Sequence, residues 1–354
     1  MTRQKLTCLA CTAVVIVTGV GAAAPSGAAT THTVQLGESI QAAVDAAKPG
    51  DSIVLAEGVH HGSVRITTSN LTLRGQGEGT VLVPATAATR ADSACATAGN
   101  GICVTGTVAK TVDGVTIRGL TLSGYKKNGL WATRTDRLEV RDVTAEKNGS
   151  WGLAQERSTR GVFRNNIARD NAESGIFVAN TIDREGGAID THGAVIRDNT
   201  LTGNRIGVTV RRVRNLSVRN NTISANCGGV FVVGDETKPW AGAMTIRNNY
   251  IFENNKFCPG NSRLPVIQGT GIVLTGSEQT VVRNNLVRNN VGSSPLSGGI
   301  VLFQSFVGAQ NVKNRVENNV LVGNKSADLA NRGTGTGNTF QRNTCEISEP
   351  TGMC

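Results

Sequence analysis

Charged side chains recur at one place in a repeated segment, four and five residues after a glycine that precedes alternating apolar residues. Glu156-Arg157 and Arg211-Arg212 both stand there. The first and third residues after the glycine are apolar in almost every repeat, so in a strand they point inward and the fourth points outward. If strands of successive repeats stack about 4.8 Å apart, Glu156 and Arg211 lie two repeats, or about 10 Å, from each other, which accommodates a sugar ring.

Two polar segments beside these strands supply further acid–base groups. They are segment 181–192, TIDREGGAIDTH, and segment 235–242, DETKPWAG. Each candidate residue taken singly is also compatible with the solvated surface of an ordinary repeat protein. As a group they form the predicted site, with catalytic candidates Glu156, Arg211, Asp235, His192 and Lys238, substrate-binding candidates Arg134, Trp131, Arg157, Phe177, Asn180, Arg212, Phe231 and Trp240, and further loop residues Asp183, Glu185, Asp190 and Glu236.

Two reactions fit a guanidinium beside carboxylates. Removal of the proton beside a uronate carboxylate needs a cation that neutralises the carboxylate and a base that takes the proton. Hydrolysis of a glycosidic bond needs two carboxylates that flank the bond, and Glu156 with Asp235 is the predicted pair. His192 is a candidate proton carrier, although an ordinary loop histidine explains it equally well.

The element that must position these residues is a repeat with three columns of equivalent residues. Successive members of the first column are never fewer than 22 residues apart, and a minimal unit with insertions in one place is typical of a solenoid. The columns are an asparagine at 166, 199, 221, 249, 285, 319 and 343, a second asparagine at 148, 171, 204, 226, 254, 290 and 324, and a Gly-apolar pair beginning at 101, 129, 152, 175, 207, 229, 271 and 299.

Each predicted strand is too short to bury a face alone, so the repeats must stack. Asparagine suits the bends because it tolerates the left-handed backbone conformation and its amide can bond to the identical amide above and below. The sequence therefore predicts asparagine ladders in one elongated domain, residues 30–354, of roughly nine or ten coils. Insertions beside the Gly-apolar strand form the walls of a groove, at 181–192, 235–242, 256–270, 291–297 and 305–313.

Both ends of the solenoid are predicted to carry a cap, because a bare final coil exposes unpaired backbone groups. Ser39 is the predicted N-cap of a short helix that ends at Pro49-Gly50. The apolar residues Ile40, Ala43, Val44 and Ala47 share one face of this helix, and residues 339–354 form the closing cap.

Residues 1–29 have the pattern of a secretory signal peptide, with Arg3 and Lys5 before an apolar run and small residues before the cleavage site. The run is too short for a comfortable membrane span, so we expect a secreted protein without one. Cys8 and Cys11 leave with this segment, and six of the eight cysteines remain. Six cysteines allow fifteen pairings, of which we predict Cys95–Cys103, Cys227–Cys258 and Cys345–Cys354, because Cys227 and Cys258 follow equivalent asparagines.

The formal charge is +10, or +8 without Arg3 and Lys5, which favours an acidic partner such as a uronate-containing or sulfated polysaccharide or teichoic acid. Nucleic acid is not expected, since 3 Trp, 2 Tyr and 8 Phe offer few rings for base stacking. Part of the charge lies at one repeated position, which is either a solvated face or a glycan-binding surface. It comprises Arg118, Arg141, Arg164, Arg197, Arg219, Arg247 and Arg283.

The segment GESIQAAVDAAKPGDSIVLAEGVHHGSVRI, followed by LTLRG and by RNN repeats, resembles the right-handed parallel β-helix, pectate-lyase-like superfamily over nearly the whole mature chain. The resemblance implies an all-β, single-stranded right-handed parallel β-helix. The resemblance does not define one function, since members include polysaccharide lyases, glycoside hydrolases, uronate epimerases and proteins without catalysis. Related lyases use Arg or Lys as the base, a role open here to Arg211, Arg212 or Lys238, and often calcium as the neutralising cation.

Two departures from the family affect the predicted chemistry. No compact DxD cluster stands on the strands to hold calcium, so no cofactor is firmly predicted, although the loop carboxylates could converge on Ca²⁺. The paired-Asp strand motif of the polygalacturonase branch is absent, which ranks hydrolysis second. The sequence predicts a secreted monomer that cleaves an acidic polysaccharide by β-elimination. A hydrolase or epimerase, and a non-catalytic glycan-binding solenoid with exposed Trp131, Phe177 and Phe231, are the alternatives.

Overall fold

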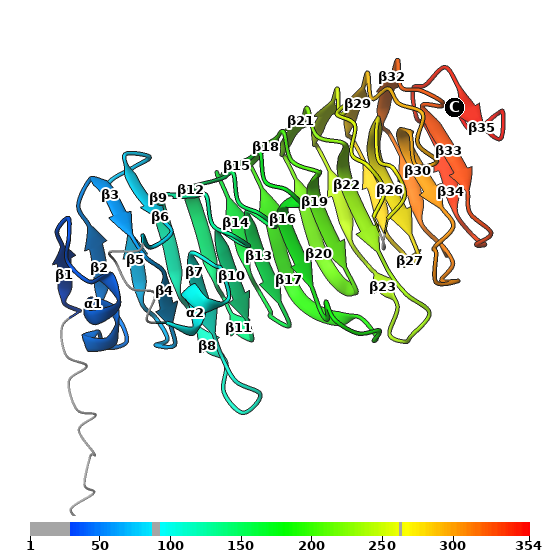
Figure 1. Cartoon of the computed structure of the whole chain (residues 1–354). Coiled ribbons are helices and arrows are strands. Elements are labelled where there is room, and N and C mark those ends of the chain that lie inside the picture. Colours follow the sequence, from blue (N-terminus) through cyan, green and yellow to red (C-terminus); the bar gives the residue numbers. More distant parts are fainter. Residues whose placement is uncertain (1–28, 87–92, 262–263) are drawn as a thin grey trace, which may run out of the picture.

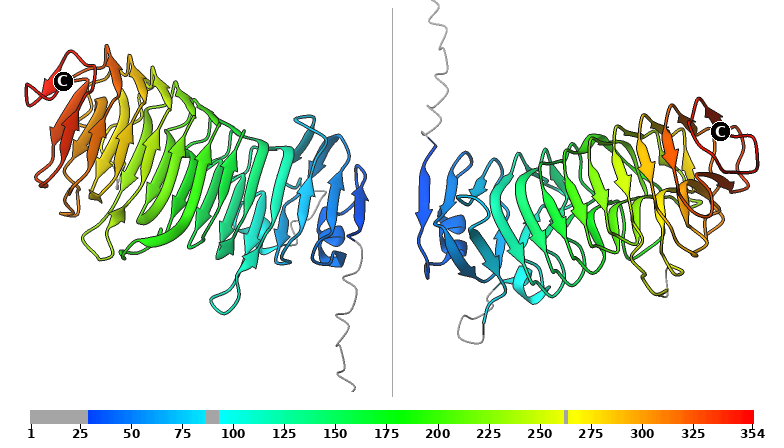
Figure 2. Two further views of the ribbon diagram at one scale, coloured as in Figure 1. Left: turned by 180° about the vertical axis from the view of Figure 1, so that it is seen from behind. Right: turned by 90° about the horizontal axis from the view of Figure 1, so that it is seen from above.

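The chain winds into an elongated solenoid of parallel strands, seen along its length in Figure 1 and from two further sides in Figure 2. This computed structural model describes residues 29–86, 93–261 and 264–354. The predicted signal segment up to residue 28, with Cys8 and Cys11, therefore lies outside the described residues. No helix among the described residues has the length and apolar character needed to cross a bilayer.

The smaller sheet contains the Gly-apolar strands that the sequence predicts. Among the described residues it has 11 strands, more than the predicted nine or ten coils, and three of them follow Ser63, Asp328 and Ile347 where the glycine is expected. The strands are β4 (Val64–Ile66), β7 (Ile102–Thr105), β10 (Leu130–Thr133), β13 (Leu153–Glu156), β16 (Ser174–Ala179), β19 (Ile206–Arg211), β22 (Gly228–Val233), β26 (Thr270–Thr275), β30 (Gly298–Phe303), β33 (Leu329–Arg332) and β35 (Ser348–Glu349).

The larger sheet supplies the other faces of each coil and has 22 strands in the described part of the chain. A separate pair consists of β8 (Val112–Asp113) and β11 (Thr135–Asp136). The larger sheet comprises β1 (Thr31–Val34), β2 (Ser52–Leu55), β3 (Gly58–His61), β5 (Thr72–Arg74), β6 (Thr80–Val83), β9 (Thr116–Ser123), β12 (Glu139–Glu146), β14 (Val162–Arg164), β15 (Ile167–Arg169), β17 (Ile189–Arg197), β18 (Thr200–Thr202), β20 (Val213–Arg219), β21 (Thr222–Ser224), β23 (Ala241–Gly242), β24 (Thr245–Arg247), β25 (Tyr250–Phe252), β27 (Ser277–Glu278), β28 (Val281–Arg283), β29 (Leu286–Arg288), β31 (Arg315–Glu317), β32 (Val320–Val322) and β34 (Thr339–Gln341).

Both predicted asparagine ladders are confirmed. Asn221 Nδ2 donates to Asn249 Oδ1 at 2.9 Å and to the Ile196 carbonyl at 3.1 Å, while Asn199 Nδ2 donates to Asn221 Oδ1 at 2.9 Å. The left-handed backbone conformation and the ladder hydrogen bonds were predicted for the same asparagine. In the structure they belong to neighbouring residues, since Asn220 has the left-handed φ of 56° and Asn221 forms the ladder. The ladders satisfy backbone groups at a buried bend, where each unpaired group would otherwise be costly.

The N-terminal cap and the cross-links also match the prediction, whereas residues 339–354, predicted as a closing cap, continue both sheets through β34 and β35. Helix α1 (Ile40–Ala46) begins after Ser39, whose Oγ accepts a hydrogen bond from the Ala42 N–H at 3.1 Å, and its apolar face joins the main core at the N-terminal end (Figure 1). A second helix, α2 (Ala94–Thr97), was not predicted. All three predicted disulfides are present, Cys95–Cys103, Cys227–Cys258 and Cys345–Cys354.

Candidate functional site

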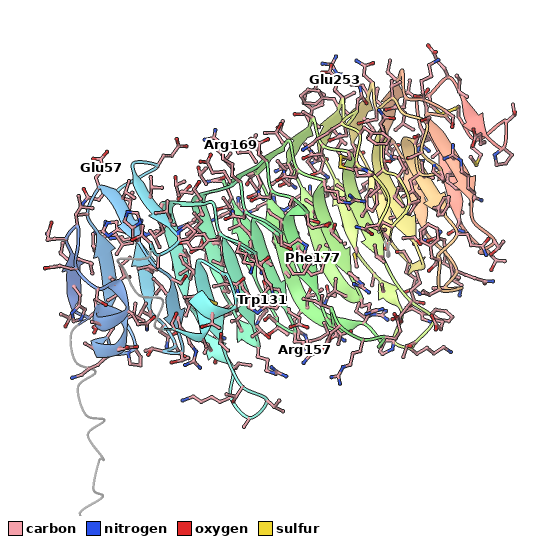
Figure 3. The ribbon with its side chains drawn as sticks, viewed as in Figure 1. Glu57, Trp131, Arg157, Arg169, Phe177 and Glu253 are labelled. Carbon is pink, nitrogen blue, oxygen red and sulfur yellow. A yellow bond between two sulfur atoms is a disulfide. The ribbon has the colours of Figure 1, made fainter. Side chains whose placement is uncertain are left out.

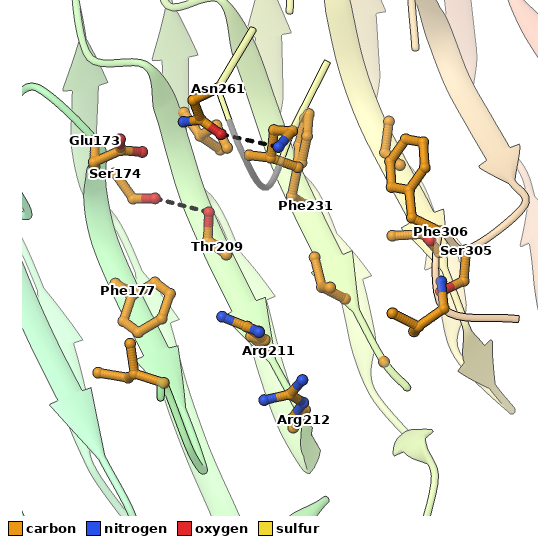
Figure 4. A pocket seen from close by; sticks show the side chains of 18 of the residues that line it. Glu173, Ser174, Phe177, Thr209, Arg211, Arg212, Phe231, Asn261, Ser305 and Phe306 are labelled. Atoms are coloured by element: carbon orange, nitrogen blue, oxygen red, sulfur yellow. Dashed lines mark hydrogen bonds between the residues drawn. The ribbon is translucent and has the colours of Figure 1, made fainter. Parts of the chain in front are cut away.

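A pocket of about 670 Å³ lies on the outer face of the smaller sheet, over β16, β19, β22 and β26, and this volume is typical of a ligand site. Four of the predicted insertions wall it, namely 181–192, 256–270, 291–297 and 305–313. Figure 4 shows Glu173 and Ser174 at one end and Arg211 and Arg212 at the other. The lining also includes Trp151, Phe177, Ile182, Asp183, Arg184, Glu185, Thr209, Phe231, Val233, Asn261, Leu264, Leu296, Phe303, Ser305 and Phe306.

The strand register under the pocket is the predicted one. Trp131, Ala154, Phe177, Thr209 and Phe231 are successive neighbours at the second position after the glycine. At the fourth position, Glu156 pairs with Ala179 and Ala179 with Arg211, so two coils separate the two charged residues as expected.

The expectation that Phe177 and Phe231 are exposed is wrong. The two side chains are only 4% and 2% exposed, because loops fold over them. Phe231 belongs to an apolar cluster outside the main core that includes Ile267, Leu296 and the Cys227–Cys258 disulfide. The side of the insertions that faces the sheet is therefore apolar. The pocket between them is narrower than the open groove that the sequence predicts.

A stack of aromatic rings forms one flank of the pocket. Trp151 lies parallel to Phe177, with ring centroids 4.1 Å apart and 7° between the planes, and Trp131 stacks on the other side of Trp151 at 5.8 Å. Trp131 and Phe177 lie on the face of the solenoid seen in Figure 3. Trp151 was missed because it precedes Gly152 in the bend, outside the strand positions that the repeat pattern singled out.

Arg211 is the one predicted catalytic residue that lines the pocket. Its neighbours at the same strand position, Ala179 and Val233, are uncharged. Across these three successive coils, only Arg211 is charged at this position. A guanidinium offers five donors in a planar fork that matches a carboxylate. This end of the pocket is therefore suited to bind an anion.

Arg212 lies in the pocket wall and has a structural role, in contrast to its predicted binding role. Its side chain is buried and forms an ion pair with Asp235 and a second with Glu185. It also donates to the carbonyls of Thr181 and Arg184. Arg212 therefore links segment 181–192 and segment 235–242 to the end of β19, and the two segments lie together as predicted. Asp235 itself does not line the pocket.

Glu156 lies beside the pocket wall, outside the lining. Its carboxylate is 3.5 Å from Arg157 Nε, and Arg157 in turn is 3.8 Å from Asp183. Burial raises the pKa of the Glu156 carboxyl, and the nearby charge of Arg157 offsets only part of this effect. Asp183 is much more accessible, with a side chain that is 81% exposed, and it does line the pocket.

The remaining predicted residues do not line the main pocket. His192 is 65% exposed and lies on β17 of the larger sheet, beside Asp190, so its predicted place in the cleft is wrong. Asn180 Nδ2 donates to the Gly187 carbonyl within its own loop. Lys238 lies over the Trp240 ring, 5.0 Å from its centroid. Trp240, Asp235 and Glu236 line a separate, smaller pocket, and Arg134 and Trp131 lie outside both.

Glu173, which the sequence reading missed, marks the far end of the pocket. It immediately precedes β16, six residues before Ala179, the register partner of Arg211, so at about 3.3 Å per residue the two ends are roughly 20 Å apart along the strands. The carboxylate of Glu173 lies 3.8 Å from the guanidinium of Arg205. The pocket thus has carboxylates near both ends, and Arg211 is a cation of its lining.

The loop carboxylates do not converge as a calcium site. In the part of the chain that the structure describes, no three His, Cys, Asp or Glu side chains are grouped to hold a metal ion. Glu185 and Asp235, two of the predicted ligands, are both paired with Arg212. These residues therefore do not fit a calcium ion.

Solved structures of several carbohydrate-active proteins share this fold. The A-module of mannuronan C-5 epimerase AlgE6 from Azotobacter vinelandii is 20% identical, with a TM-score of 0.58 over 88% of this chain and 90% of that one. A DFA-IIIase from Arthrobacter chlorophenolicus A6 is 14% identical, with a TM-score of 0.57 over 87% and 90%. An alginate lyase from Paenibacillus sp. str. FPU-7 is 17% identical, with a TM-score of 0.50 over 90% and 99%.

No curated protein matches the sequence significantly. A family model, described as the right-handed beta helix region, matches residues 54–182 and 179–305, which together span more than half of the 354 residues. The chain therefore belongs to the family of right-handed β-helix proteins.

Proposed function

We propose that the pocket binds a segment of an acidic polysaccharide and that the protein cleaves it by β-elimination. The observation that carries the proposal is Arg211, a guanidinium at one end of a loop-walled pocket whose flank is the Trp151–Phe177 stack. A guanidinium pairs with a carboxylate through two parallel hydrogen bonds. The uronate-related names of two proteins with the same fold, an epimerase and an alginate lyase, favour the same substrate class.

In this reaction Arg211 neutralises the uronate carboxylate, which stabilises the negative charge that develops when the neighbouring proton leaves. Asp183, exposed and on the loop that Arg212 holds beside Arg211, takes that proton. The electron pair forms a double bond within the ring between the carbon that lost the proton and its neighbour. The bond from that neighbour to the glycosidic oxygen breaks, and this oxygen takes up a proton from water. The three disulfides support an extracellular place of action, because such bonds persist in oxidising compartments.

Hydrolysis is the second candidate, and it is favoured by a different observation. Asp183 and Glu185 are both carboxylates of the pocket lining and lie on the same loop, whereas the predicted pair of Glu156 and Asp235 is absent from it. A hydrolase needs two carboxylates on either side of the scissile bond. The DFA-IIIase with the same fold makes this alternative worth a direct assay.

One incubation series distinguishes these reactions. The mature protein is incubated in D₂O with polymannuronate, polygalacturonate, hyaluronan and a heparinoid. Elimination produces an unsaturated sugar that absorbs in the ultraviolet, and hydrolysis produces new reducing ends without this absorbance. Epimerisation introduces deuterium beside the carboxylate without shortening the chain. We expect the unsaturated product on at least one uronan, and the lyase proposal is overturned if none of the four polymers yields it.

A further inference from the structure

Arginines form a continuous column on the outer face of the larger sheet, away from the sheet that carries the pocket. Eight of them are direct strand neighbours, one per coil, and adjacent strands lie about 4.8 Å apart. Burial and the like charges of Arg74 and Arg141 lower the pKa of Arg118. The column runs through Arg74, Arg118, Arg141, Arg164, Arg197, Arg219, Arg247 and Arg283 and ends at Glu317.

The middle of this column is neutralised by acidic neighbours. Arg141 Nη1 lies 2.7 Å from the Asp142 carboxylate, and Arg164 Nε lies 2.8 Å from the Glu139 carboxylate. Arg197 forms an ion pair with Asp198, the residue that follows it. This stretch is an ordinary solvated face in which each cation has an anion beside it.

The next three coils are different. The residue that follows each arginine changes from Asp at 142 and 198 to Asn at 220, 248 and 284. Among the residues described here, no acidic side chain lies within ion-pair distance of Arg219, Arg247 or Arg283. Three cations therefore extend about 10 Å along the solenoid without ion-pair partners in the described part of the chain, and Glu317 on the next strand ends the run.

A fourth cation, Arg288, stands five residues after Arg283 at the end of β29 and is held in place by aromatic rings. Arg288 lies over the rings of Tyr250 and Phe252, 5.3 and 5.7 Å from their centroids. The two rings also stack on each other at 4.3 Å, so their faces are already engaged. A fixed guanidinium loses less side-chain entropy when it binds an anion than a mobile one does.

We propose that Arg219, Arg247, Arg283 and Arg288 form a second binding surface for a linear polyuronate, which lies along the solenoid axis with one carboxylate on each sugar. Charge complementarity favours a regular polyanion, since the cations repeat once per coil and a sugar ring is comparable in length to the coil spacing. This surface is independent of the reaction proposed for the pocket.

The test compares two triple variants that remove the same number of charges from the same column. They are Arg219→Gln/Arg247→Gln/Arg283→Gln and, as the matched control, Arg141→Gln/Arg164→Gln/Arg197→Gln. Both are made with Arg211→Gln in the full mature protein, so that cleavage does not shorten the probe. Binding of long polygalacturonate is measured at low and at high salt, and thermal unfolding confirms that both variants fold.

We expect the first variant to bind polygalacturonate about tenfold more weakly, from three exposed ion pairs of ordinary strength, and the control to lose about twofold or less. The difference should vanish near 1 M salt, where the screening length is about 3 Å. Equal losses of affinity in both variants, or no loss of affinity in the first, would contradict the proposed binding surface. Tighter binding of single-stranded polynucleotide or of a sulfated glycan than of polygalacturonate, at equal charge number, overturns the assigned partner.

If the first triple variant does not fold, the single variant Arg247→Gln replaces it, with an expected loss of about twofold in affinity. Product formation from a short uronate oligosaccharide, which fits the pocket alone, is measured separately with wild-type Arg211. If polygalacturonate binding is unaffected by the triple variant but the oligosaccharide is cleaved, only the second binding surface is excluded. If the oligosaccharide is not cleaved but the variant weakens polymer binding, only the proposed reaction is excluded.

Discussion

The guanidinium of Arg212 lies 2.5 Å from the carboxylate of Asp235, and the two side chains are only 3% and 2% exposed. This buried ion pair joins the end of strand β19 to the segment after β22. Asp235 also accepts hydrogen bonds from the N–H groups of Gly186 and Thr237. The pair thus fixes the loop beside Arg211, so the shape of the pocket depends on a buried carboxylate, that of Asp235, which does not line it.

Replacement of Asp235 by Asn should destabilise the protein by about 3 kcal/mol, because it removes the buried one of the two counter-charges of Arg212 and leaves only the more exposed Glu185. Equilibrium unfolding in denaturant measures the change. Glu236→Gln is the matched control, since Glu236 is the exposed neighbour, and it should change stability by less than about 0.5 kcal/mol. Similar losses in both variants would show that the buried pair contributes nothing specific.

Replacement of Arg211 by Gln should reduce turnover of the preferred uronan about a hundred- to a thousandfold, the usual effect of removing one charge-stabilising group. The thermal midpoint should remain that of the wild type, because Arg211 is partly exposed on the pocket surface. Arg65→Gln removes an exposed arginine from β4 of the same sheet and should leave turnover unchanged. Full activity in the Arg211 variant would exclude this residue from the reaction.

Replacement of Asn221 by Ala should cost at least about 3 kcal/mol of unfolding free energy, because it strands several buried hydrogen-bonding groups at once. The amide donates to Ile196, Arg219 and Asn249 and accepts from Asn199. Asn343, at the end of the same ladder, is the comparison site.

Asn343 donates to Val316 and accepts from Asn319 alone, so Asn343→Ala should cost roughly half as much as Asn221→Ala. Denaturant unfolding of both variants measures the two losses. An equal cost at the middle and the end of the ladder would contradict the view that the bonds to both neighbouring coils stabilise the fold.

Replacement of Glu156 by Gln should raise stability at neutral pH. Burial raises the pKa of this carboxyl, so the folded protein holds the proton more tightly than the unfolded chain does. The contribution of Glu156 is therefore fully favourable below its ordinary pKa of about 4.3 and is lost as pH rises through the folded-state pKa.

Thermal midpoints of wild type and Glu156→Gln should coincide in acid and separate in favour of the variant as the pH rises to neutral. Asp183→Asn is the control for the loop, because Asp183 is exposed and its carboxylate lies beside the same Arg157. A Glu156 variant that is less stable than the wild type at neutral pH would mean that the ion pair with Arg157 outweighs the burial.

The strand register, the ladders and the disulfides were predictable because they depend on equivalence between repeats. Once Asn221 and Asn249 occupy the same column, stacking places them one coil apart, and it brings Cys227 near Cys258 for the same reason. The pairing of Ala179 with both Glu156 and Arg211 follows from the same count.

The contents of the pocket were not predictable in this way, because the segments that build it do not repeat. A periodic pattern indicates that Phe177 points outward, but only the tertiary structure shows that a loop covers it. Likewise, Asp235 turns back to Arg212 and His192 falls on the other sheet, because each loop follows the burial and hydrogen bonds available to it. Local sequence determined the coil, and contacts between non-equivalent residues decided which charges face the pocket.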